Sequence, residues 1–122
     1  MYVLEIEDDF AAAHQLRGYH GKCENLHGHN WRVRVGVRGE KLLDSGMLMD
    51  FGDLKKIVKE VLMALDHRFL NEIEPFVAAN PTTERIARHI YEEVAKRLPN
   101  NVRMDGVTAW ESEKSRSTYR EY

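Results

Sequence analysis

The stretch HGHNWRVRVGVR, residues 27–38, alternates side chains with a period of two and constrains the fold more than any other part of the chain. Successive side chains of a β-strand point to opposite faces of the sheet. One face therefore carries His27, His29, Trp31, Val33, Val35 and Val37, and the other carries Asn30, Arg32, Arg34 and Arg38. The pattern predicts a strand with one core face and one polar face, so other elements must cover the valines.

Three further segments show weaker alternation. Residues 2–10 place Leu4, Ile6 and Phe10 against acidic neighbours, which is typical of a half-buried strand. Residues 103–110 and 117–122 alternate again, with the charged turn SEKSRS between them, and predict a hairpin. Four strands are therefore expected.

Two helices are expected between these strand pairs. Apolar residues recur at spacings of three and four over residues 51–65, and Asp50 or Asp53 can cap that helix. A second helix follows a cap at Thr82 or Thr83 and ends before Pro99. The order ββααββ favours an α+β fold, a four-stranded antiparallel sheet with both helices on one face.

Composition limits the class of protein. A chain of 122 residues with 43% hydrophobic content fits one domain spanning residues 1–122. A net charge of −2 provides no general field for nucleic acid or an anionic membrane, so neither partner is expected. The sequence also has no apolar stretch of membrane-spanning length and no basic leader, which predicts a cytoplasmic protein.

The histidines of the HGH motif indicate metal binding. His27 and His29 project from one face of the strand about 6.5–7 Å apart along the chain, close enough to share one zinc ion. His14 and His20 compete for the third position, and His14 is favoured because it directly follows the first strand. Three histidines leave a coordination position for water or substrate, as in catalytic zinc sites. The alternative is a solvated or structural motif.

Three residues are candidates for acid–base chemistry. Cys23 is the only cysteine, so it is a reactive thiol, an inert buried thiol or a fourth zinc ligand. Asp66 and His67 follow the first helix, where the carboxylate could orient the imidazole and raise its basicity. The competing interpretation of His67 is a helix C-terminal residue that the dipole favours.

Two carboxylates have both a structural and a functional interpretation. Glu84 lies in the first turn of the second helix, where an acidic side chain interacts favourably with the dipole. Glu111 shares the strand face of Val107 and Ala109, at the rim of the apolar side. A carboxylate there could accept two parallel N–H bonds from a planar ring edge such as that of a guanine or pterin, or it could be a surface charge.

Six motifs in order resemble the 6-pyruvoyl-tetrahydropterin synthase and 6-carboxy-tetrahydropterin synthase family: FAAAHQL, CENLHGHNW, GMLMDFGDLK, LDHRFLNE, NPTTERIA and WESE. The resemblance implies the tunnelling fold (T-fold) and assigns roles by position. It implies that His14, His27 and His29 bind zinc and that Cys23 is the catalytic base beside Asp66 and His67. It further implies that Glu111 anchors the pterin and that Thr82, Thr83 and Glu84 help to line its pocket.

The resemblance also implies an activity and an assembly. The three residues between Cys23 and the HGH motif resemble the 6-carboxy type, a lyase that makes the queuosine precursor from 7,8-dihydroneopterin triphosphate, rather than the 6-pyruvoyl type. Family members form trimeric rings that stack into homohexamers, with sites at subunit contacts. Outside the family, a zinc hydrolase using Glu24 or Glu111, or a ring-forming domain whose structural zinc is closed by Cys23, remain alternatives.

Overall fold

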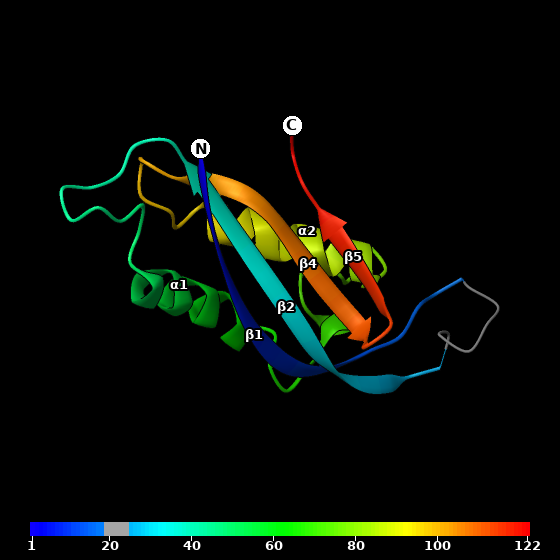
Figure 1. Ribbon diagram of the computed structural model, residues 1–122. Coiled ribbons are helices and arrows are strands. Elements are labelled where there is room, and N and C mark those ends of the chain that lie inside the picture. Colours follow the sequence, from blue (N-terminus) through cyan, green and yellow to red (C-terminus); the bar gives the residue numbers. More distant parts are fainter. Residues whose placement is uncertain (19–24) are drawn as a thin grey trace.

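The computed structural model describes residues 1–18 and 25–122. Within them, five strands form one sheet in the order β3-β1-β2-β4-β5 (Figure 1). The strands are β1 (Tyr2–His14), β2 (His27–Gly39), β3 (Arg68–Phe69), β4 (Arg103–Ser112) and β5 (Ser115–Tyr119). Helices α1 (Phe51–Met63) and α2 (Thr83–Ala95) lie together on one face of the sheet, which confirms the predicted α+β class.

The long hairpin of β1 and β2 is the centre of the sheet. Its antiparallel register runs from Tyr2 opposite Gly39 to His14 opposite His27. β1 is longer than predicted, so His14 ends the strand instead of following it. The register therefore places His14 and His27 as direct neighbours on two strands.

The core lies between the sheet and the two helices. The predicted inward series of Trp31, Val33, Val35 and Val37 has no solvent exposure at all. Helix α1 covers it with residues such as Leu54, and α2 with residues such as Ile86, also fully buried. Burying each such side chain contributes roughly 1.5–3 kcal/mol, so this layer gives the metal-site candidates a rigid support.

Side-chain caps fix where each helix begins. The carboxylate of Asp50 accepts a hydrogen bond of 2.6 Å from the backbone N–H of Gly52 at the start of α1. The hydroxyl of Thr82 accepts one of 3.2 Å from the backbone N–H of Arg85 at the start of α2. Each cap satisfies a helix N–H that would otherwise lack a partner. Asp50 and Thr82 are thus the caps, and Asp53 and Thr83 lie inside the helices.

The sheet departs from the prediction of four antiparallel strands. A fifth strand, β3, pairs in parallel with the end of β1, so the sheet is mixed. Ala12 pairs with Arg68, and Ala13 with Phe69. His67 adopts a φ of 58°, a left-handed conformation that turns the chain from α1 into β3. A strand of two residues is too short to show an alternating pattern, which is why the sequence did not reveal it.

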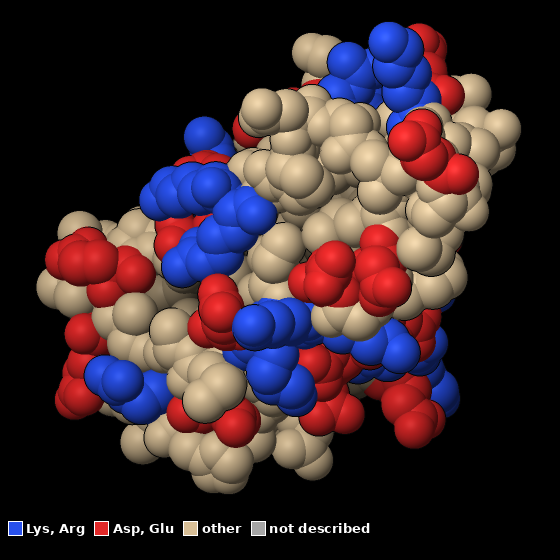
Figure 2. All heavy atoms as spheres, turned by 90° about the vertical axis from the view of Figure 1, so that its left-hand side faces the viewer, with Lys and Arg blue, Asp and Glu red and all other residues tan. Residues whose placement is uncertain are grey.

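Ion pairs join neighbouring strands on the polar face of the sheet. Glu7 receives N–H groups of Arg32 at 2.8 Å and of Arg34 at 3.1 Å. The guanidinium of Arg32 also lies 4.4 Å above the ring centroid of Trp110. Figure 2 shows basic and acidic side chains interspersed over one side of the molecule, without a single-sign field there. None of the described helices combines the length and apolar character needed to cross a membrane.

Candidate metal centre

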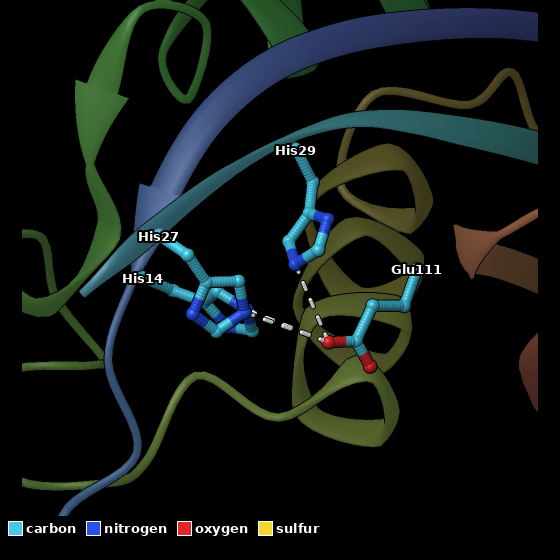
Figure 3. A group of neighbouring side chains, drawn as sticks. All are labelled: His14, His27, His29 and Glu111. Atoms are coloured by element: carbon cyan, nitrogen blue, oxygen red, sulfur yellow. Dashed lines mark hydrogen bonds and ion pairs between the residues drawn. The ribbon is translucent and has the colours of Figure 1, made fainter. Parts of the chain in front are cut away.

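Three imidazoles converge where β1 ends and β2 begins. The Nε2 atoms of His14 and His27 lie 3.1 Å apart, and the rings of His27 and His29 have centroids 4.5 Å apart. Figure 3 shows the three rings pointing toward a common point beside Glu111. The strand register produces this convergence, because His14 and His27 are paired and His29 follows on the same face.

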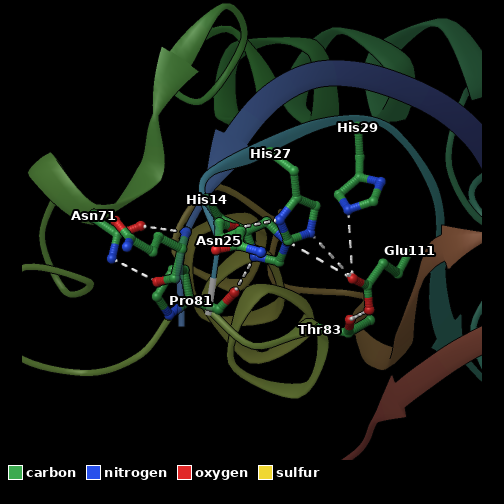
Figure 4. A network of polar contacts seen from close by, with 9 residues as sticks. His14, Asn25, His27, His29, Asn71, Pro81, Thr83 and Glu111 are labelled. Atoms are coloured by element: carbon green, nitrogen blue, oxygen red, sulfur yellow. Dashed lines mark hydrogen bonds and ion pairs between the residues drawn. The ribbon is translucent and has the colours of Figure 1, made fainter. Parts of the chain in front are cut away.

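Backbone carbonyls orient two of the rings. His14 Nδ1 lies 2.8 Å from the carbonyl oxygen of Pro81, and His27 Nδ1 lies 2.6 Å from that of Asn25 (Figure 4). An Nδ1–H that donates to a carbonyl leaves a lone pair on Nε2, which is the usual arrangement of a metal-binding histidine. Two such lone pairs 3.1 Å apart repel one another unless a cation lies between them.

Burial favours the neutral form of two of the three imidazoles, His14 and His29. Burial in the core lowers the pKa of both His14 and His29, and the neighbouring His27 lowers both further. His29 Nε2 is buried and has no hydrogen-bond partner among the described residues. The Trp31 ring packs against two of the imidazoles, with its centroid 5.0 Å from that of His14 and 5.3 Å from that of His29. Neutral imidazoles with an unpartnered nitrogen suit a metal ion.

Glu111 completes the cluster from the end of β4. Its Oε1 lies 3.7 Å from His14 Nε2, 3.8 Å from His27 Nε2 and 3.4 Å from His29 Nε2. All four ligand atoms lie within 4.8 Å of one another. Three imidazole nitrogens and one carboxylate oxygen match the donor set of zinc, so the residues present fit this ion.

The other carboxylate oxygen of Glu111 faces a separate pocket. Thr83 Oγ1 donates to Glu111 Oε2 over 3.3 Å. A pocket of about 200 Å³ is lined by Thr83, Glu84, Glu111, Ser115, Arg116 and Ser117. Three of the four residues predicted to bind the pterin thus share one pocket, whereas Thr82 acts as the cap of α2. The charged turn SEKSRS was the sequence signal for Arg116, which the prediction did not include.

Asp66 and His67 form a pair at the β3 edge of the sheet. Asp66 Oδ2 lies 3.0 Å from His67 Nδ1. Asp66 Oδ1 accepts a hydrogen bond of 2.9 Å from the backbone N–H of Ala11, and this bond is the largest cause of the lowered pKa of the Asp66 carboxyl; His67 lowers it further. The predicted pairing of carboxylate and imidazole is present, and the imidazole is 82% exposed.

This pair does not join the histidine cluster. His67 and Arg68 line a pocket of about 530 Å³ at the β3 edge of the sheet, together with residues of β1 and β2 that include His29. Ala11, Ala13, Gly28 and Asn30, which also line it, alternate with the three histidines along β1 and β2, so the pocket borders the histidine cluster only through His29. Asp66 and His67 are also absent from the described side chains whose ligand atoms converge.

Several predicted residues lie outside the description. Cys23, Glu24 and His20 belong to residues 19–24, which the structure does not describe, so their roles stay predictions. Near this stretch, Arg17 donates through Nη2 to the carbonyl oxygens of Phe76 at 2.6 Å and Val77 at 3.2 Å. Arg17 therefore anchors a loop.

Comparisons with known proteins agree on one family. The family model described as 6-pyruvoyl tetrahydropterin synthase matches residues 3–122. A putative 6-carboxy-5,6,7,8-tetrahydropterin synthase of Archaeoglobus fulgidus is 43% identical over 78% of this chain and 77% of its own. A dihydroneopterin monophosphate aldolase of Pyrococcus furiosus is also 43% identical, over 84% of this chain and 82% of its own. The solved structure of Caenorhabditis elegans 6-pyruvoyl tetrahydropterin synthase superposes with a TM-score of 0.89 at 34% identity, covering 99% of this chain and 96% of the other.

Proposed function

The chain belongs to the 6-pyruvoyl tetrahydropterin synthase family, and we propose that it is a zinc-dependent lyase that converts 7,8-dihydroneopterin triphosphate to 6-carboxy-5,6,7,8-tetrahydropterin. The reaction consumes one water molecule, and acetaldehyde and triphosphate are the other products. The pterin serves queuosine synthesis. The observation that carries the proposal is the convergence of three imidazoles beside the pocket that Glu111 lines. The A. fulgidus relative bears the name of this activity, and the three-residue spacing between Cys23 and His27 also favours the carboxy type.

The proposed mechanism assigns separate tasks to the zinc ligands, the pterin pocket, Cys23 and the pair of Asp66 and His67. His14, His27 and His29 would hold zinc, whose positive charge stabilises oxyanion and enolate character in the substrate side chain. Glu111, with Thr83 and Glu84 beside it, would orient the pterin ring through its N–H edge. Cys23 would remove the side-chain proton, since a nearby cation favours its thiolate. Asp66 holds His67 by a 3.0 Å contact, so His67 can give and accept a proton at its exposed edge.

The separation of these groups supports a site shared between subunits. Asp66 and His67 lie outside the convergent group of three histidines and Glu111, and the pocket that His67 lines at the β3 edge includes only His29 of that group. We propose that single-domain chains assemble as trimeric rings that stack into a cytoplasmic homohexamer. The dyad of one chain then approaches the zinc centre of its neighbour.

A second activity has a specific observation in its favour. The P. furiosus relative, named as an aldolase of dihydroneopterin monophosphate, matches this chain at the same identity and with greater coverage than the A. fulgidus relative. An aldolase would break a carbon–carbon bond of the side chain and keep the phosphate on the released fragment. The same zinc centre and pterin pocket could serve that reaction. A pyruvoyl product, formed by elimination of triphosphate, is the third possibility within the family.

One experiment separates these activities. The zinc-loaded protein is incubated with dihydroneopterin triphosphate or monophosphate, and the pterin and the released fragments are identified by mass spectrometry. We expect 6-carboxytetrahydropterin, acetaldehyde and triphosphate, and no conversion by Cys23→Ala that has kept its zinc. A phosphorylated aldehyde from the monophosphate would instead establish the aldolase, and turnover that survives in Cys23→Ala would favour a zinc hydrolase.

A further inference from the structure

Glu111 lies at the distance of a metal ligand and not only of a pterin anchor. Four ligands at about 2.0–2.1 Å from a tetrahedral zinc ion are separated from one another by about 3.3 Å. Glu111 Oε1 is 3.4 Å from His29 Nε2 and 3.7–3.8 Å from the other two Nε2 atoms, while His14 and His27 are 3.1 Å apart. These distances are close to the edges of one tetrahedron.

Hydrogen bonds explain the position of only one carboxylate oxygen. Oε2 accepts a hydrogen bond from Thr83 Oγ1, whereas Oε1 faces the Nε2 atoms of three imidazoles. Two of these rings, His14 and His27, already donate a hydrogen bond through Nδ1 to a backbone carbonyl. Oε1 therefore faces the Nε2 lone pairs of His14 and His27. A cation at their centre removes this repulsion, and it would be bound by four protein ligands, with no position left for water or substrate.

The pterin pocket makes competing use of the same carboxylate. Glu111 borders the pocket of about 200 Å³, and its side chain is 30% exposed, so it has room to move away from the imidazoles. A carboxylate that binds the N–H edge of a ring with both oxygens cannot also keep one oxygen on a metal in the same geometry. The two uses of Glu111 therefore exclude one another.

We infer that Glu111 is the fourth ligand of the metal in the free protein and leaves it when a pterin ring binds. The exchange breaks one metal–carboxylate bond and forms two N–H···O bonds, without any net transfer of a proton. It opens a coordination position on the metal only when the pterin ring is bound. Before the ring binds, Glu111 keeps other small ligands from reaching the metal. The exchange rests on the proposed function for its pterin, whereas the closed four-ligand site does not.

Cobalt-loaded protein can test the closed site without turnover. The probe is azide, which alters the visible absorption of Co²⁺ when it can reach a coordination position. We expect no response from the wild-type protein, a clear response from Glu111→Ala, and a metal affinity about ten- to hundred-fold lower in that variant. Glu113→Ala removes the same charge from the adjacent exposed turn and should behave as wild type. Glu111→Gln, which preserves shape, should also lose affinity, and it controls for misfolding.

A pterin without a side chain at carbon 6 tests the exchange. Its binding should make the wild-type cobalt protein responsive to azide, because Glu111 then holds the ring. A wild-type spectrum that responds to azide before any pterin is added, or an unchanged metal affinity in Glu111→Ala, would overturn the closed site. A bound pterin that leaves the metal unresponsive would overturn the exchange. Failure to convert either phosphorylated substrate would count against the proposed function alone.

Discussion

At the residue scale, the histidine centre depends on a few precise contacts. Strand periodicity sufficed to predict that His27 and His29 share a face, and the antiparallel register explains why His14 joins them. The position of Glu111 was only half predicted. Its place on the inward face of β4 followed from Val107 and Ala109, but the rotamer that turns Oε1 toward the imidazoles depends on packing between distant strands.

The cluster predicts which histidine substitutions remove the metal. His14→Ala, His27→Ala and His29→Ala should each reduce zinc from about one ion per chain to a small fraction, because each deletes one convergent Nε2 donor. Elemental analysis of dialysed protein measures the ratio. His20→Ala is the matched control and should keep its zinc. If His20→Ala loses the ion while His14→Ala keeps it, the third ligand has been misassigned.

At the element scale, the start of α2 connects helix stability to the candidate metal centre. Thr82 caps the helix, the carbonyl of the adjacent Pro81 holds His14, and Thr83 in the first turn holds Glu111. The sequence predicted the cap but could not show that the residues on either side of it reach the histidine centre. That information lies in the packing of α2 against β4 and of the preceding Pro81 against the end of β1, which local patterns do not encode.

Replacing the cap should therefore have two effects. Thr82→Ala should lower the free energy of unfolding by roughly 0.5–2 kcal/mol because the N–H of Arg85 loses its acceptor. It should also weaken zinc binding, since Pro81 and Thr83 then position His14 and Glu111 less firmly. Urea denaturation of the metal-free protein and a chelator titration measure the two effects. Thr82→Ser keeps the hydroxyl and should approach wild type in both; equal losses in the two variants would exclude the hydroxyl as the cause.

Asp66 joins the end of α1 to β1 through the N–H of Ala11, and this contact predicts a pH dependence. The pKa of Asp66 is lowered in the folded protein, so its ionised form stabilises the fold above the ordinary aspartate pKa. That contribution is lost as pH falls through the lower, folded-state pKa. The stability difference between wild type and Asp66→Asn should shrink as the pH falls below the ordinary aspartate pKa. Denaturant unfolding across pH measures it, and a difference that stays undiminished in acid would contradict this assignment.

At the scale of the whole molecule, the histidine cluster and the pair of Asp66 and His67 occupy different places on the sheet. The cluster lies where β1 ends and β2 begins, whereas His67 lies at the β3 edge, in a pocket that includes only His29 of the cluster. The sequence predicted the histidine cluster and the pair of Asp66 and His67, but not that they lie apart. They lie apart because β3 pairs in parallel with the edge of the sheet, after a left-handed turn at His67. No periodic pattern in the sequence indicates that turn.

The separation predicts that inactive variants can restore one another. His27→Ala lacks a zinc ligand and His67→Ala lacks the exposed imidazole, so each should be inactive alone under the proposed function. If each site takes its zinc centre from one chain and its imidazole from the neighbour, a random equal mixture should recover about a quarter of the wild-type activity per site. The variants are mixed by refolding together, and product formation is measured after the oligomer is isolated by size. His27→Ala mixed with His29→Ala is the control and should stay inactive, because every zinc centre then lacks a ligand. Recovery in that control, or none with His67→Ala, would mean that the site is not divided between chains as proposed.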